Sequence, residues 1–207
     1  MTNQTSLEGR TAVVTGAGAG LGRSEALALA GQGARVVVND VGPAARDVAA
    51  EIREAGGEAV AVIGDIGEWA MGDRLVDTAL ERFGRLDIVV NNAGVVRDRM
   101  LFNLTESEWD EVIRVHLKGH ATLSRAAAAH WRRASKAVGG PVYGRVVNTS
   151  SEAFLFGSPG QANYAAAKAG ITSLTLALAR GMSRYGVRAN AICPRARTGM
   201  TAEVFGA

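Results

Sequence analysis

The sequence predicts an α/β fold in which a doubly wound parallel sheet lies between two layers of helices. Apolar runs rich in valine and isoleucine alternate with helical stretches along the chain, without repeats or low-complexity linkers. The runs are continuously apolar, as expected for strands that helices cover on both faces. Regular alternation of such strands with helices is typical of a parallel sheet. A glycine-rich turn after the first run, and polar residues after several others, predict a ligand-binding edge.

The elements of this fold can be assigned in order along the chain. We expect strands near residues 11–15, 35–39, 59–63, 86–91, 145–149 and 188–192, and helices near residues 21–32, 44–55, 69–83, 107–135 and 162–185. The expected arrangement is Rossmann-type, with three αβα layers and strand order 3-2-1-4-5-6. With 207 residues, 47% of them hydrophobic, the chain is long enough for one dinucleotide-binding oxidoreductase domain over residues 1–207.

The first turn has the composition of a dinucleotide-binding turn. It extends from Thr15 to Gly22, after a predicted strand and before a predicted helix, and its glycines have the spacing TGxxxGxG. A GxGxxG frame does not fit. Glycines let the backbone approach a pyrophosphate, and the helix N-terminus offers free N–H groups and the positive end of its dipole. A tight loop that binds no ligand is the alternative.

Asp40, at the end of the second predicted strand, favours NAD over NADP as the cofactor. It lies about 20 residues beyond the glycine turn, where an acidic side chain accepts hydrogen bonds from the adenosine ribose. The same carboxylate would repel a 2′-phosphate. No Lys or Arg lies between Gly16 and Gly20 to offset that repulsion.

A tyrosine and a lysine four residues apart, Tyr164 and Lys168, indicate acid–base chemistry. Residues at this spacing share one helix face, so the ammonium can lie beside the phenol. A tyrosine that acts as a base near pH 7 needs its pKa lowered from about 10 to about 7, or about 4 kcal/mol. A neighbouring positive charge favours the phenolate. Ser151 supplies a hydroxyl that can hold an alcohol or carbonyl oxygen. A chance pair on an ordinary helix is the alternative for the Tyr–Lys pattern taken alone.

With these residues in place, the chain resembles the single-domain branch of the short-chain dehydrogenase/reductase family along essentially its whole length. The resemblance depends on the order and spacing of the glycine turn, Asp65, the Asn-Asn-Ala-Gly run and the Ser, Tyr and Lys. It implies that Tyr164 is the general acid/base, that Lys168 lowers its pKa and binds the nicotinamide ribose, and that Ser151 orients the substrate oxygen. The cofactor contacts that it implies come from Gly16, Gly18, Gly20, Leu21, Gly22, Asp40, Asp65, Ile66, Asn92, Ala93, Gly94, Tyr164, Lys168, Pro194 and Thr198.

Two positions depart from the family pattern. The family usually carries an Asn where this chain has His116, and many members have Gly where it has Arg195. The Asn is thought to shape its helix so that a main-chain carbonyl holds a water in a proton relay. We expect His116 to preserve that geometry and to act as the fourth catalytic residue. The Val-His-Leu variant resembles the (3R)-hydroxyacyl-CoA dehydrogenase part of peroxisomal multifunctional enzymes and bacterial proteins linked to steroid breakdown.

The expected function is therefore NAD-dependent interconversion of a secondary alcohol and a ketone, with a 3-hydroxyacyl-CoA or a hydroxysteroid as substrate. A non-catalytic NAD-binding sensor or assembly protein on the same fold is the alternative, and His116 and the short C-terminus favour it slightly. A sugar-nucleotide epimerase also uses a Tyr–Lys pair with NAD, but the glycine spacing and the lack of an extra substrate domain count against it.

Composition narrows the partners and the compartment. The net charge is +3, and the densest basic patch, residues 131–136, is either a solvated helix end or a contact for a phosphate-bearing substrate such as CoA. No basic stripe alternates with aromatics, so we expect no nucleic-acid partner. No apolar run approaches about 18 residues, and the first ten residues hold no signal-peptide core. With Cys193 as the single cysteine, a cytoplasmic protein is expected. His116 and His120 are four apart but lack a third ligand, so no metal is expected.

Two further expectations concern assembly and the C-terminus. The helices expected at 107–135 and 162–185 are rich in Ala and Leu, and the equivalent helices of the family pair between subunits, which implies a homodimer or homotetramer. Close helix–sheet packing is the alternative use of their small residues. Family members usually continue past the sixth strand with a substrate-covering segment and a seventh strand. We therefore expect this chain to be truncated at its C-terminus.

Overall fold

The fold is described by a computed structural model that covers residues 6–196. Its centre is a six-stranded sheet of order β3-β2-β1-β4-β5-β6, in which every neighbouring pair is parallel. The predicted strand order is confirmed, and the described residues hold no seventh strand. The strands are β1 Thr11–Thr15, β2 Arg35–Asp40, β3 Ala59–Ile63, β4 Ile88–Asn91, β5 Gly144–Thr149 and β6 Val187–Ile192.

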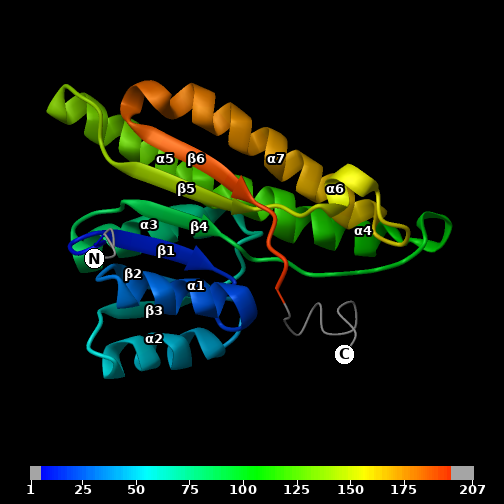
Figure 1. Cartoon of the computed structure of the whole chain (residues 1–207), viewed down its shortest axis with the longest axis horizontal. Helices are drawn as coiled ribbons and strands as arrows, with labels where there is room; N and C mark the ends of the chain where they lie inside the picture. The colour runs from blue at the N-terminus through cyan, green and yellow to red at the C-terminus, as the bar shows by residue number, and fades with distance from the viewer. Residues whose placement is uncertain (1–5, 197–207) are drawn as a thin grey trace, which may run out of the picture.

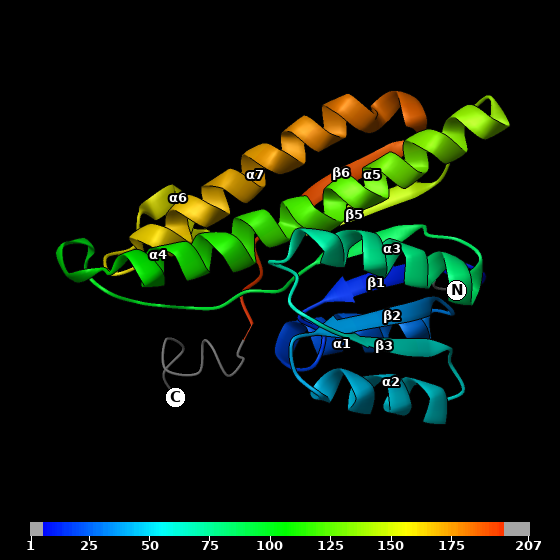
Figure 2. The same cartoon turned by 180° about the vertical axis from the view of Figure 1, so that it is seen from behind.

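Helices cover both faces of this sheet, as the sequence predicted. α1 (Gly20–Gly31) and α2 (Ala44–Glu54) lie on the face toward the viewer in Figure 1. α3 (Trp69–Phe83), α5 (Gly119–Val138) and α7 (Ala162–Met182) lie on the opposite face, which Figure 2 shows. Because side chains alternate along a strand, Val14 and Val38 pack toward α1 and α2, while Val13 and Val37 pack toward α3 and α5.

The prediction of one long helix over residues 107–135 is wrong in one respect, because the structure divides this stretch into three consecutive helical segments. α4 (Glu106–Ile113) begins at a capping box formed by Thr105 and Glu108. A π-helical turn, Arg114–Lys118, follows and leads directly into α5. Apolar periodicity does not distinguish a five-residue π turn from ordinary helix, and such turns are frequent at functional sites. The prediction also lacked the short helix α6 (Ala153–Phe156) and the 3₁₀ turns Leu101–Asn103 and Ser183–Tyr185.

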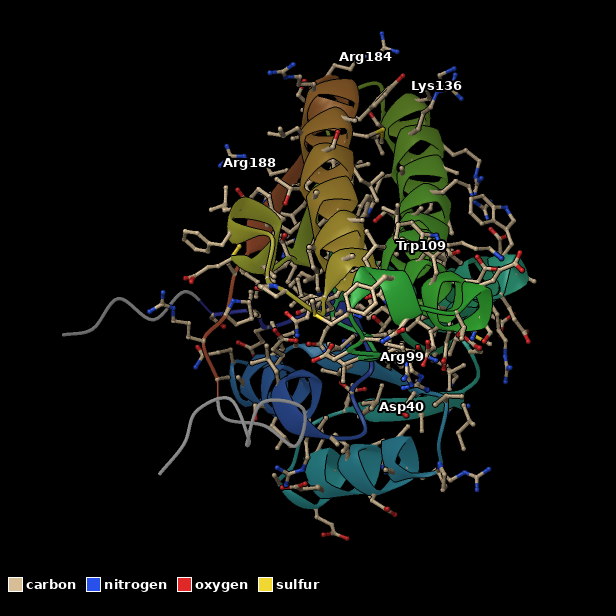
Figure 3. The ribbon with its side chains drawn as sticks, turned by 90° about the vertical axis from the view of Figure 1, so that its right-hand side faces the viewer. Asp40, Arg99, Trp109, Lys136, Arg184 and Arg188 are labelled. Carbon is tan, nitrogen blue, oxygen red and sulfur yellow. The ribbon has the colours of Figure 1, made fainter. Side chains whose placement is uncertain are left out.

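The basic patch at residues 131–136 lies at the edge of the sheet where the strands begin. Trp131 packs against Gly144, the first residue of β5, and Arg132 lies near Tyr185, just before β6. Figure 3 shows Lys136 and Arg184 at the ends of α5 and α7, far from Asp40. A substrate held near Ser151, just beyond the end of β5, lies at the opposite edge. The structure therefore favours the solvated helix end and gives no support to a CoA contact at this patch.

Candidate active site

The glycine turn between β1 and α1 has the tight form that a dinucleotide requires. Gly16 has a φ of +61°, in the left-handed region that favours glycine. A Cβ on Gly22 would collide with the Gly16 carbonyl and with the side-chain amide of Asn92. Gly20 and Leu21 begin α1, whose first N–H groups lack helical acceptors. The turn thus presents bare backbone at a helix N-terminus, which fits a phosphate group.

Asp40 lies beside this turn, held by backbone N–H groups. Its carboxylate accepts hydrogen bonds from the N–H of Gly18 at 2.9 Å and from that of Gly42 at 3.0 Å. No Lys or Arg forms an ion pair with it among residues 6–196. The negative charge at the end of β2 is therefore fixed in position and not neutralised by a basic side chain.

Asp65, after β3, has a partner that the sequence did not suggest. Arg114, the first residue of the π turn, donates from Nη1 to its carboxylate at 2.6 Å, and the N–H of Gly67 donates at 2.7 Å. Burial alone would raise the pKa of Asp65, but these hydrogen bonds outweigh it and lower that pKa. Ile66, which follows, is buried. The predicted adenine end of the site is thus tied to the helix that carries His116.

The run Asn92–Gly94 joins the two halves of the sheet. The backbone N–H groups of Asn92 and Ala93 both donate to the Thr15 hydroxyl, at 3.1 and 3.2 Å. The Asn92 side chain donates to the carbonyls of Thr15 and Gly16, each at 3.2 Å. Gly94 lies directly against the His116 ring, where a Cβ would collide with it. The end of β4 therefore holds the glycine turn on one side and the π turn on the other.

Lys168 is buried at the base of the site, with 2% of its surface exposed. Its Nζ donates to the Thr149 carbonyl at 2.6 Å and lies 5.2 Å from the centre of the Tyr164 ring. Burial lowers the pKa of this lysine to about 7. The expected helical juxtaposition of the ammonium and the phenol ring is therefore present.

Tyr164 and Ser151 come together, as the sequence predicted, because α7 begins beside the end of β5. The Ser151 hydroxyl lies beside the Tyr164 phenol and accepts from the N–H of Ala153 at 3.2 Å. Burial raises the pKa of Tyr164, the neighbouring Ser151 hydroxyl lowers it, and the charge of Asp98 raises it further, so that the net direction is upward.

His116 packs edge-on against Tyr164, with ring centres 5.2 Å apart and an angle of 89°. Its Nε2 lies 3.0 Å from the backbone N and 2.7 Å from the backbone O of Val95. Burial first, and then the charge of Lys168, lower the pKa of this histidine to about 3. The ring is therefore neutral at pH 7 and is fixed by the loop after β4.

Sequence reasoning missed two groups that border the site. Asn163 is fully buried; its Oδ1 accepts from the N–H of Tyr164 at 2.8 Å, and its Nδ2 donates to the Arg97 carbonyl at 3.2 Å. Arg195 forms a two-point ion pair with Glu152, at 2.9 and 2.7 Å, beside Ser151. The only signals for them were their positions next to Tyr164 and Pro194. Pro194 is exposed after β6, and Thr198 lies outside the described residues.

A glycine turn, an acidic strand end and a Ser–Tyr–Lys set at one edge of a parallel sheet are typical of a nicotinamide-dependent oxidoreductase. The chain belongs to the short-chain dehydrogenase family, whose sequence profile, described as short chain dehydrogenase, matches residues 10–206. It is 64% identical over 213 residues to a hydroxyacyl-CoA dehydrogenase of Mycobacterium tuberculosis, covering 100% of this chain and 67% of that protein. It is 44% identical over 208 residues to the peroxisomal multifunctional enzyme type 2 of Mus musculus, covering 96% of this chain and 27% of that protein.

A solved structure of a short chain dehydrogenase from Mycobacterium avium also matches, with a TM-score of 0.90 and 56% identity over 94% of this chain and 70% of that one. The chain spans about two thirds of its mycobacterial relative and about a quarter of the peroxisomal enzymes. None of the helices within residues 6–196 is long and apolar enough to cross a membrane.

Proposed function

We propose that this dehydrogenase uses NAD(H) to interconvert a 3-hydroxyacyl-CoA thioester and the corresponding 3-oxo thioester. The observation that carries the proposal is the grouping of Ser151, Tyr164 and Lys168 at the same edge of the parallel sheet as the glycine turn. The name of the mycobacterial relative, a hydroxyacyl-CoA dehydrogenase, supports the substrate class. A hydroxysteroid is the second substrate class that the sequence favours.

In the oxidative direction, Ser151 would hold the substrate oxygen and Tyr164, as phenolate, would take the hydroxyl proton. The glycine turn, Tyr164 and Lys168 would hold NAD⁺, which when bound would supply the hydride acceptor of the reaction. Lys168 would bind the nicotinamide ribose and, while charged, favour the phenolate. His116 would take part in proton transfer away from Tyr164 as a neutral ring. Because burial raises the pKa of Tyr164, we expect oxidative kcat to rise as the pH is raised above 7.

We propose NAD rather than NADP because the Asp40 carboxylate is fixed beside the turn without a basic partner. The cofactor would contact the glycine turn, Asp40, the backbone near Asp65 and the run Asn92–Gly94, in addition to Tyr164 and Lys168. Titration of the protein with NADH and with NADPH tests this. The protein should bind NADH more tightly than NADPH. Asp40→Ala should bring the two affinities closer together, because it weakens NADH binding and removes the repulsion of the 2′-phosphate of NADPH. Tighter binding of NADPH by the unaltered protein would contradict the assignment.

The substrate class is tested by NADH formation from NAD⁺ with 3-hydroxyacyl-CoA esters and, separately, with hydroxysteroids. Turnover of the CoA esters with little turnover of the steroids supports the proposal. Turnover of the steroids with little turnover of the CoA esters would assign a hydroxysteroid as the substrate class. NADH binding without any turnover would favour a cofactor sensor instead.

We further propose that residues 1–207 act as a single domain in a cytoplasmic homodimer or homotetramer, without nucleic-acid or membrane partners. The exposed face of α7 supports self-association. Leu176 on that face is 56% exposed, its neighbours Ala169, Ser173 and Ala177 are also exposed, and α7 carries no charged residue between Lys168 and Arg180. An exposed, uncharged helix face of this kind is typical of protein interfaces. Light scattering of the purified protein measures the assembly directly.

A further inference from the structure

A second buried histidine lies behind the proposed catalytic groups and takes no part in the mechanism above. His120, with 1% of its surface exposed, is the second residue of α5. Its Nδ1 lies 2.7 Å from the backbone carbonyl of His116, one turn earlier. A buried imidazole with a short contact to one particular carbonyl is an arrangement that the packing of α5 alone does not require.

The carbonyl that His120 reaches belongs to the π turn. There the N–H of Gly119 bonds to the Arg114 carbonyl, five residues back, and to the His116 carbonyl, three residues back. Such a turn displaces the regular ladder of backbone hydrogen bonds and is held only where its surroundings favour it. A side-chain donor on the next helical turn gives one of its carbonyls an additional partner. The His120 ring is therefore placed where it can favour the π turn over continuous α-helix.

The two ring nitrogens of His120 differ in their surroundings. Nδ1 faces the His116 carbonyl at 2.7 Å, while Nε2 has no hydrogen-bond partner among the described residues. The backbone of Asn91 also lies near the ring. Complete burial first, and then the charge of Lys168, lower the pKa of this histidine well below its usual value, so the ring is neutral. A neutral imidazole has one N–H to donate, and the short contact selects Nδ1 as its donor.

We propose that His120 is a positioning residue: as the Nδ1–H tautomer it holds the His116 carbonyl and so fixes the π turn that seats the His116 ring against Tyr164. His120 is connected to Tyr164 through a single residue, His116. His120 bonds to the His116 backbone, and the His116 ring contacts both Val95 and Tyr164. Loss of the His120 hydrogen bond would let the turn relax and move the ring that borders the Tyr164 phenol.

The tautomer can be measured without any substrate or cofactor. The chain has three histidines, His116, His120 and His130, so two-bond ¹H–¹⁵N spectra of the labelled protein can be assigned by single substitution. We expect His120 to remain the Nδ1–H tautomer from pH 6 to pH 8.5. An Nε2–H tautomer, or protonation within that range, would overturn the proposal.

Variants test the positioning role, and this arm rests on the proposed function. His120→Asn keeps a donor close to the place of Nδ1, His120→Gln keeps one near Nε2, and His120→Leu keeps neither. We expect His120→Leu and His120→Gln to lower kcat about tenfold and to shift the pH profile of kcat, while NADH affinity stays unchanged. His120→Asn should have a kcat and a pH profile close to those of the unaltered protein. Equal kcat and pH profiles in all three variants would overturn the proposal, as would better rescue by Gln than by Asn.

Ser135→Ala is the matched control on the same helix. The Ser135 hydroxyl donates to the Gly140 carbonyl at 2.6 Å, at the far end of α5. Its loss should lower stability but leave kcat and the pH profile unchanged. If the unaltered protein turned over no substrate, the proposed function would fail, while the tautomer measurement would still decide the role of His120.

Discussion

The two halves of the sheet meet at one site but contribute different chemical groups to it. On the β1–β3 side the site is built mainly from backbone, with bare glycines at 16 and 22 and an Asp40 carboxylate held by two N–H groups. On the β4–β6 side it is built from buried and half-buried side chains that lie close to one another. Changes in the first half should therefore alter cofactor affinity, and changes in the second half should alter the rate of the chemical step.

The largest expected effect is that of Tyr164→Phe, which removes the proposed acid/base and keeps the ring. We expect kcat to fall by about 10²- to 10⁴-fold, the usual range for a general acid/base, while the affinity for NADH stays within about twofold. Initial rates of NADH formation and fluorescence titration with NADH measure the two quantities. Retained turnover would mean that another group moves the proton.

Gly22→Ala should instead lower the affinity for NADH and leave kcat little changed. Its Cβ would overlap the Gly16 carbonyl and the Asn92 amide, and overpacking of this kind costs about 1–3 kcal/mol. If that cost falls on cofactor binding, NADH affinity drops by about 5- to 150-fold, with kcat at saturating NAD⁺ little changed. Gly31→Ala, in the same helix, is the matched control. Apart from its chain neighbours and the helix's own backbone, no atom lies within 4 Å of the added Cβ. Equal NADH affinities for the two variants would count against a close backbone approach to the cofactor.

This contrast also explains how far the sequence alone could lead. The strand order, the glycine turn and the place of Asp40 depend on local patterns of apolar residues and glycines, so they could be predicted. Ser151, Tyr164 and Lys168 could be placed in one site because their spacing brings them to one strand end and one helix face. The Arg114–Asp65 pair and the π turn could not be predicted, because they depend on contacts between residues far apart in the sequence or on a five-residue change of helical pitch.

Asp87, at the opposite edge of the sheet, provides a change that should affect stability without affecting the site. Its buried carboxylate accepts from Arg85 at 2.7 Å, and from Arg10 and the N–H of Thr11 at 2.9 Å each. Asp87→Asn should lower the free energy of unfolding by about 1–3 kcal/mol, with NADH affinity and kcat unchanged in the folded protein. Urea unfolding at pH 7 measures the loss.

The same carboxylate predicts a pH dependence. Burial opposes ionisation, but the hydrogen bonds from Arg85, Thr11 and Arg10 outweigh it and hold the pKa of Asp87 below its usual value. Its contribution is therefore fully present above the unfolded-state pKa of about 3.9 and is lost as the pH falls through the lower folded-state pKa. Stability curves of the Asp87→Asn variant and the unaltered protein should converge in that acid range; a constant gap down to pH 2 would contradict this.

The smallest expected effect is that of the Arg195–Glu152 pair. Such exposed ion pairs contribute little to stability, so Arg195→Ala should leave the melting temperature almost unchanged. Because Glu152 follows Ser151, we expect a threefold to tenfold rise in KM for the CoA ester. Arg125→Ala, which breaks the exposed pair with Asp73 between α5 and α3, is the control. An unchanged KM would show that the pair does not position Ser151.

The most direct test of the division between the two halves is single-turnover hydride transfer at saturating NAD⁺, compared in Tyr164→Phe and Gly22→Ala. We predict that Gly22→Ala, given enough NAD⁺, transfers hydride at nearly the rate of the unaltered protein, while Tyr164→Phe binds NAD⁺ normally and transfers hydride hundreds of times more slowly or not at all. Comparable slow transfer in both variants at full NAD⁺ occupancy would contradict the account, because the glycine turn would then act in the chemical step.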